Sequence, residues 1–107
     1  MINLIKFKKE YYNNIITGTK TQTLRLARKR LDVQEGEICK AIFPGTKLEC
    51  KIQITEIGYK QFKSINQEDA KLEGYNTIEE LKNTLKEIYP LIDEWDRLYY
   101  YRFKLIQ

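Results

Sequence analysis

The sequence has no histidine, two cysteines and two prolines. Without histidine, the chain lacks the usual general base near neutral pH and the commonest metal ligand. The two cysteines, Cys39 and Cys50, fall in neighbouring predicted strands, where small half-buried side chains are the simplest interpretation. We therefore expect no metal and no cofactor, and any catalysis must use lysine, carboxylate, hydroxyl or thiol groups.

Long apolar runs are also missing, and none approaches the roughly 20 residues that a membrane helix needs. The opening segment MINLIKFKKEYY lacks the apolar stretch and cleavage site of a signal peptide. We expect a soluble cytoplasmic protein that makes no contact with membranes. A chain of 107 residues suits one domain over residues 1–107, which we expect to be monomeric.

Charge is distributed unevenly along the chain. Residues 1–31 hold eight lysines or arginines against one acid, and residues 64–96 hold nine acids against three lysines. A basic stretch of this kind can bind phosphates, which makes nucleic acid a candidate partner. A solvated charged face, balanced by acids elsewhere in the fold, explains the same pattern.

Apolar periodicity predicts strands over residues 2–7, 21–24, 38–43, 48–57 and 98–106. A helical spacing over residues 10–17 ends at Gly18, and a short helix is predicted over residues 66–72. A longer helix begins at a Thr77–Glu80 capping box and ends before Pro90. This order indicates an α+β fold, a small closed or half-closed barrel of about five to six strands, mostly antiparallel, with helices packed outside. The last strand is expected to pair with the first and help close the barrel.

The segment GTKTQTLR is the strongest candidate for a functional site. Gly18 lets backbone amides approach a ligand closely, and Lys20 and Arg25 supply two cations. Thr21, Thr23 and Arg25 are two residues apart on an extended segment, so they are expected to project from one face. The pattern predicts an anion or nucleotide site, although a strand with a polar outer face remains an alternative.

This segment resembles the signature of the ASCH family, a branch of the PUA-like superfamily, whose motif is G-x-K-x-x-x-x-R after a helix. Gly18, Lys20 and Arg25 occupy those positions. Further along, Gly36-Glu37 resembles a turn of the family, and the last strand YYYRFKLI resembles the family's last strand. The pairs Asp69-Ala70, Glu73-Gly74 and Glu80-Leu81 resemble the family's helical insert. The resemblance covers essentially the whole chain.

The resemblance implies a PUA-like β-barrel with a cleft beside the GTKTQTLR loop and a role with RNA. One subgroup of small bacterial members hydrolyses N4-acetylcytidine to cytidine and acetate with a lysine, a threonine and a glutamate. By position these catalytic residues match Lys20, Thr23 and Glu73. The likeness thus implies an RNA or modified-nucleoside partner and a hydrolase that needs no histidine.

Other residues point towards a polynucleotide. Gly18, Thr21 and Arg25 are expected to bind nucleic acid together with the basic cluster Arg28, Lys29 and Arg30. Trp95 and the tyrosines at positions 99–101 can stack on bases, although such aromatics more often form core or cleft walls.

Several functions stay open at this point. The leading hypothesis is an amidohydrolase acting on N4-acetylcytidine, and the alternative is a non-catalytic RNA-binding module. A ribonuclease and a small protein-binding regulator are further possibilities that no particular residue favours.

Overall fold

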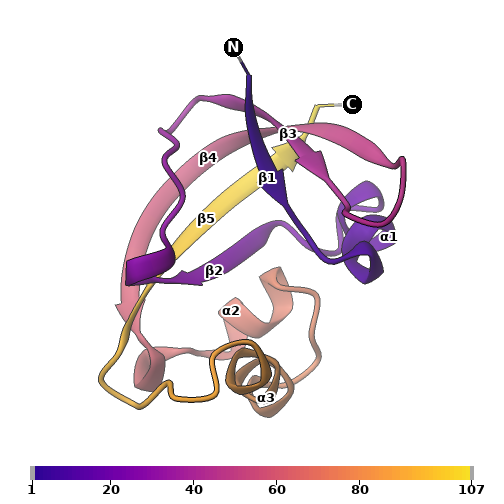
Figure 1. Ribbon diagram of the computed structural model, residues 1–107. Coiled ribbons are helices and arrows are strands. Elements are labelled where there is room, and N and C mark those ends of the chain that lie inside the picture. Colours follow the sequence, from indigo (N-terminus) through magenta and orange to yellow (C-terminus); the bar gives the residue numbers. More distant parts are fainter. Residues whose placement is uncertain (1, 107) are drawn as a thin grey trace.

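A five-stranded, mostly antiparallel sheet forms the frame of the molecule, as the sequence predicts. The computed structural model describes residues 2–106. The strand order is β1-β3-β4-β5-β2, in which β1 runs parallel to β3 and the other neighbours are antiparallel. Figure 1 shows the sheet curling into a half-barrel. The strands are β1 (Asn3–Lys6), β2 (Gln22–Leu26), β3 (Ile38–Ile42), β4 (Glu49–Gln61) and β5 (Arg97–Leu105).

The half-barrel has two open edges, β1 and β2. The prediction that the last strand pairs with the first is wrong, because β5 lies between β4 and β2. Strand order depends on contacts between distant segments, and a local pattern does not carry that information. The Arg25 guanidinium in β2 donates a hydrogen bond of 2.9 Å to the carbonyl of Lys6 in β1. A side chain, not a strand ladder, therefore connects the two edges.

Three α-helices pack against the sheet: α1 (Tyr12–Ile16), α2 (Gln67–Leu72) and α3 (Ile78–Ile88). Short 3₁₀ turns lie over Lys9–Tyr11 (η1), Ala27–Lys29 (η2) and Phe62–Ser64 (η3). Gly18 follows α1 with a φ of 79°, a left-handed conformation that glycine adopts without strain. This confirms Gly18 as the point where the first helix stops.

Two reciprocal capping boxes begin the later helices. Asn66 and Asp69 bond to each other's backbone amides at the start of α2, and Thr77 and Glu80 do the same at the start of α3. The second box is the one that the sequence predicts. These caps fix where each helix begins.

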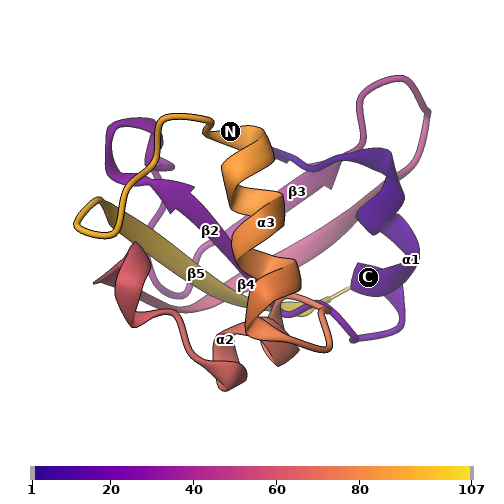
Figure 2. The same cartoon turned by 90° about the horizontal axis from the view of Figure 1, so that it is seen from below.

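Two apolar cores lie on the two faces of the sheet. The inner core of the half-barrel includes Ile5, Phe43 and Ile52, and the outer core joins Leu24 of β2 to Leu81 of α3. Figure 2 shows α3 lying across the sheet on this second face. Cys39 and Cys50 are both buried free thiols, and burial raises the pKa of each. None of the helices described over residues 2–106 is long and apolar enough to span a membrane.

Candidate active site

Lys20 and Glu73 form a buried ion pair. Lys20 lies two residues before the start of β2, and its amide donates to the carbonyl of Asn14. Glu73 is the C-cap residue of α2, where its amide donates to the carbonyl of Asp69. The Lys20 Nζ–Glu73 Oε1 distance is 2.9 Å, and the side chains are only 3% and 5% exposed. The structure thus brings together two of the three predicted catalytic residues.

The surroundings of this pair are low in polarity. The ammonium of Lys20 lies 4.7 Å from the ring centroid of Tyr11, and Glu73 Oε2 has no hydrogen-bond partner among the described residues. Burial raises the pKa of Glu73, and the opposing effect of Lys20 only partly offsets it. A carboxyl group whose charged form is disfavoured is suited to carry a proton near neutral pH.

Thr23 and Arg25 line the same pocket as this ion pair. The pocket encloses about 180 Å³. The hydroxyl oxygen of Thr23 accepts a hydrogen bond from Arg25 Nε at 3.4 Å, and Thr23 is 6% exposed. Burial lowers the pKa of Arg25. A hydroxyl, an ammonium and a carboxyl therefore face one small cavity, which is a set of groups that acyl transfer can use.

Tyrosines and the apolar side of α3 complete the walls. Tyr11 and Tyr75 share a hydrogen bond of 2.8 Å between their hydroxyls, and burial together with this bond raises the pKa of Tyr11. The hydroxyl of Tyr89 accepts from the amide of Leu26. Flat aromatic walls with a few polar groups suit a planar, polar ring such as a nucleobase. None of these three tyrosines was predicted as a site residue from the sequence, although Tyr75 directly follows the Glu73-Gly74 pair.

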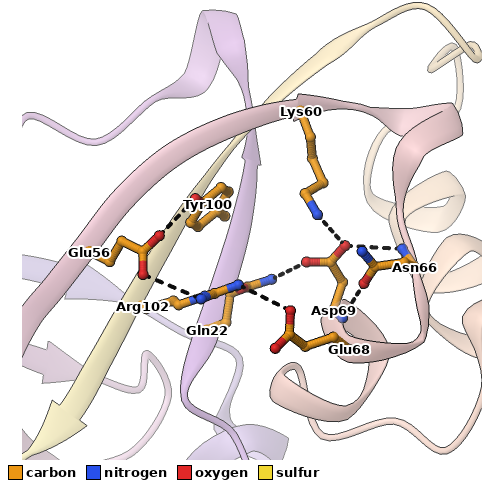
Figure 3. A network of polar contacts seen from close by, with 8 residues as sticks. All are labelled: Gln22, Glu56, Lys60, Asn66, Glu68, Asp69, Tyr100 and Arg102. Carbon is orange, nitrogen blue, oxygen red and sulfur yellow. Dashed lines mark hydrogen bonds and ion pairs between the residues drawn. The ribbon is translucent and has the colours of Figure 1, made fainter.

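A second polar network holds α2 against the sheet, as Figure 3 shows. The buried carboxylate of Asp69 accepts from Gln22 Nε2 at 3.1 Å and from Lys60 Nζ at 2.6 Å. Gln22 Oε1 in turn accepts from Arg102 Nε at 3.0 Å. Gln22 lies two residues after Lys20, and Asp69 lies four residues before Glu73. The network therefore fixes the two segments that carry the ion pair, and sequence analysis missed it because Gln22 alternates with the threonines as an ordinary strand residue.

The remaining predicted site residues lie elsewhere. Gly18 and Thr21 line a separate groove beside α2, so the prediction that Thr21 projects with Thr23 and Arg25 is wrong. Thr21 precedes β2, and its amide donates to the carbonyl of Leu72. The basic cluster Arg28, Lys29 and Arg30 is exposed at and just after η2, and it does not line the pocket.

Comparison with known proteins assigns the family. The sequence model of the ASCH domain matches residues 3–107, so this chain belongs to the ASCH domain family. Solved structures show the same fold. An ASCH domain from Lactobacillus crispatus matches with a TM-score of 0.81 at 19% identity, and covers 97% of this chain and 79% of its own.

Two further solved structures agree. A protein of Enterococcus faecalis assigned to the family DUF984 matches with a TM-score of 0.79 at 13% identity, over 99% of this chain and 77% of its own. A single-substitution variant of the ASCH protein of Zymomonas mobilis matches with a TM-score of 0.64 at 12% identity, over 94% of this chain and 67% of its own. The search of curated proteins found no significant match.

Proposed function

We propose that this ASCH domain protein hydrolyses N4-acetylcytidine, or a closely related N-acylated pyrimidine, to the free amine and a carboxylate. The observation that carries the proposal is the buried Lys20–Glu73 ion pair in a pocket that Thr23 also lines. The resemblance to the acetylcytidine-hydrolysing subgroup rests on the same three residues. The aromatic walls of the pocket suit the pyrimidine ring.

The ion pair can generate the base that the reaction needs. An ammonium cannot accept a proton, so Lys20 must first transfer one to Glu73, which leaves a neutral amine beside a carboxylic acid. Burial disfavours the charged form of the Glu73 carboxyl, which favours the transfer of a proton to it. The raised pKa of Glu73 is in line with it.

The first half of the reaction transfers the acetyl group. Thr23 Oγ1 attacks the acetyl carbonyl carbon while its proton passes to the amine of Lys20. The tetrahedral intermediate then breaks its C–N bond, and Glu73 protonates the departing cytidine amine. The products of this half are cytidine, an acetyl ester on Thr23, an ammonium on Lys20 and a carboxylate on Glu73.

The second half restores the enzyme. Glu73 takes a proton from water as the water oxygen attacks the ester carbonyl. The C–O bond to Thr23 breaks, and Lys20 returns a proton to the threonine oxygen. Acetic acid leaves and ionises in solution. One water is consumed for each amide bond cleaved, and histidine is not needed.

Cytidine release from N4-acetylcytidine, followed by liquid chromatography, tests this proposal. The purified protein is expected to turn over, and Lys20→Ala is expected to reduce the rate at least 100-fold, in the range typical for loss of a general base. Lys71→Ala is the matched control, because Lys71 is an exposed lysine of α2 outside the pocket. Equal rates for Lys20→Ala and the control would refute the assigned role.

A second candidate function is RNA binding by the same chain. The observation that favours it is the exposure of Arg28, Lys29 and Arg30, three consecutive cations that meet no carboxylate in the ion pairs found within residues 2–106. Such a cluster is expected to contact phosphates, and affinity would then fall steeply with salt. Binding of labelled RNA at 50 and 200 mM salt, with the three residues replaced by glutamine, measures this directly.

A further inference from the structure

A strip of alternating aromatic and basic side chains lies at one end of β4 and β5. We define this aromatic–basic strip as Arg30, Tyr59, Lys63, Trp95, Arg97 and Tyr99. None of its members lines the pocket that holds Lys20 and Glu73. Its function is therefore separable from that of the pocket.

Strand pairing places three members of the strip, Tyr59, Arg97 and Tyr99, on one face of the sheet. Tyr59 pairs with Tyr99 across β4 and β5, with ring centroids 6.0 Å apart, and Arg97 lies two residues before Tyr99. The side chain of Gln61 donates to the carbonyl of Trp95, which joins the loop before β5 to this end of the sheet.

A positively charged side chain lies close to each aromatic ring of the strip. Lys63 Nζ lies 3.5 Å from the ring centroid of Trp95, and Arg97 Cζ lies 4.6 Å from that of Tyr59. Arg30 Cζ lies 5.9 Å from the ring centroid of Tyr99. These contacts place positive charge beside each aromatic surface.

The rings remain available to a partner. Trp95 is 64% exposed and Tyr59 is 61% exposed, although both are large apolar side chains that a domain normally buries. Two nearby carboxylates already accept hydrogen bonds from backbone amides. Asp93 accepts from the amide of Trp95, and Asp96 accepts from the amide of Asp93. Glu94 is exposed and is the one acid of this loop without such a bond among the described residues.

We propose that the aromatic–basic strip binds single-stranded nucleic acid. Bases stack on Trp95 and Tyr59, and the phosphates between them contact Lys63, Arg97 and Arg30. Stacking on aromatic rings beside cations is the general chemistry by which proteins hold single strands without reading sequence, whereas a paired duplex hides its base faces. The proposal rests on the RNA-binding role and not on amide hydrolysis.

Fluorescence provides the test, because Trp95 is the only tryptophan of the chain. Titration with a twelve-nucleotide uridine oligomer is expected to quench Trp95 emission through stacking, and a thymidine oligomer shows whether RNA is preferred over DNA. Anisotropy of labelled oligomers measures affinity for variants that lack tryptophan. Trp95→Ala with Tyr59→Ala is expected to weaken binding at least tenfold, and Trp95→Phe is expected to retain most of it.

A charge variant separates the strip from general attraction to a basic protein. Lys63→Gln with Arg97→Gln is expected to lower the salt slope by about 1.4, since each single-strand phosphate contact contributes about 0.7. Lys47→Gln with Lys51→Gln removes the same charge from exposed residues of another region. Equal effects of the two pairs, or binding that the aromatic variants leave unchanged, would overturn the strip as the binding surface. Failure of the unaltered protein to bind either oligomer at low salt would overturn the RNA-binding role as well, while acetylcytidine turnover would be unaffected by either result.

Discussion

Lys20 and Glu73 lie 53 residues apart in the sequence, yet their side chains meet at 2.9 Å in the buried floor of one pocket. Lys20 comes from the approach to the edge strand β2, and Glu73 comes from the end of α2. The pair therefore exists only when the sheet and the helical segment are both in place. A substitution at either residue is therefore expected to change both the stability of the fold and the chemistry of the pocket.

Removing one partner of the ion pair is expected to lower the free energy of unfolding by more than would be expected from its share of the loss when both partners are removed. Lys20→Met leaves a buried carboxylate without its cation, and we expect a loss of about 3–5 kcal/mol in the free energy of unfolding. The double variant Lys20→Met with Glu73→Leu leaves no unpaired charge, and its loss should be smaller than the sum of the two single losses. Urea denaturation of the four proteins at pH 7 measures this cycle. Strictly additive losses would show that the two groups do not interact.

The pH dependence of stability follows from the raised pKa of Glu73. Its ordinary value is 4.5, and the folded state binds the proton more tightly than the unfolded state does. The stabilising contribution of the protonated group is complete below pH 4.5 and falls as the pH rises from 4.5 through the folded pKa. The free energy of unfolding of the natural chain, minus that of Glu73→Gln, should therefore decrease as the pH rises through this range. A difference that increases with pH would mean that Lys20 outweighs burial and holds the pKa down.

The network around Asp69 predicts a contrast between two neighbouring acids, Asp69 and Glu68 (Figure 3). Asp69 is 1% exposed and accepts from Gln22, Lys60 and the amide of Asn66. Asp69→Asn is expected to destabilise the protein by about 2–4 kcal/mol, because Lys60 loses its buried partner. Glu68 pairs with Arg102 at 3.7 Å with 70% of its side chain exposed, and Glu68→Gln is expected to cost less than about 1 kcal/mol.

Thermal unfolding of both variants separates these cases. Asp69→Asn should lower the midpoint by several degrees more than Glu68→Gln does. It should also reduce acetylcytidine turnover, since the network holds α2 and hence Glu73 in place. Similar unfolding midpoints for the two variants would contradict the role of Asp69 in holding α2 against the sheet.

The ring of Tyr100 in β5 occupies the space where a side chain at Gly58 in β4 would lie. Gly58 is paired with Tyr100 in the β4–β5 register, and a Cβ added at Gly58 would collide with the ring and hydroxyl of Tyr100. Gly58→Ala must displace the ring from its hydrogen bond with Glu56, and we expect a loss of about 1–3 kcal/mol from overpacking. In a Tyr100→Leu background the same change should cost much less. An equal cost in both backgrounds would point to backbone strain instead of the ring.

Local patterns predicted most of the elements and part of the site. The Thr77–Glu80 capping box located α3, and Gly18 marked the end of α1, because both signals are set by a few adjacent residues. The position of β5 between β4 and β2 was not predictable in this way, since it depends on which distant strand the chain meets. Thr21 lies before β2, which begins at Gln22, so the strand alternation that relates Thr23 to Arg25 does not extend to it.

The pocket could be predicted only in part for the same reason. Lys20, Thr23 and Glu73 were found through the family resemblance, whose motif positions are local in sequence. Tyr75, Tyr89 and the Gln22–Asp69 contact join segments far apart in the chain, and no spacing rule connects them. The residues that shape the pocket are thus those for which the three-dimensional fold was needed.

The hydroxyl of Thr23 is the group on which the proposed reaction depends most directly. The decisive measurement is the initial rate of cytidine release from N4-acetylcytidine by the natural chain, by Thr23→Ser and by Thr23→Val. We predict turnover by the natural chain, measurable turnover by the serine variant, which keeps the nucleophile, and background release by the isosteric valine variant. Release by Thr23→Val at the rate of the natural chain, or no release by the folded natural chain, would contradict the proposed catalytic mechanism.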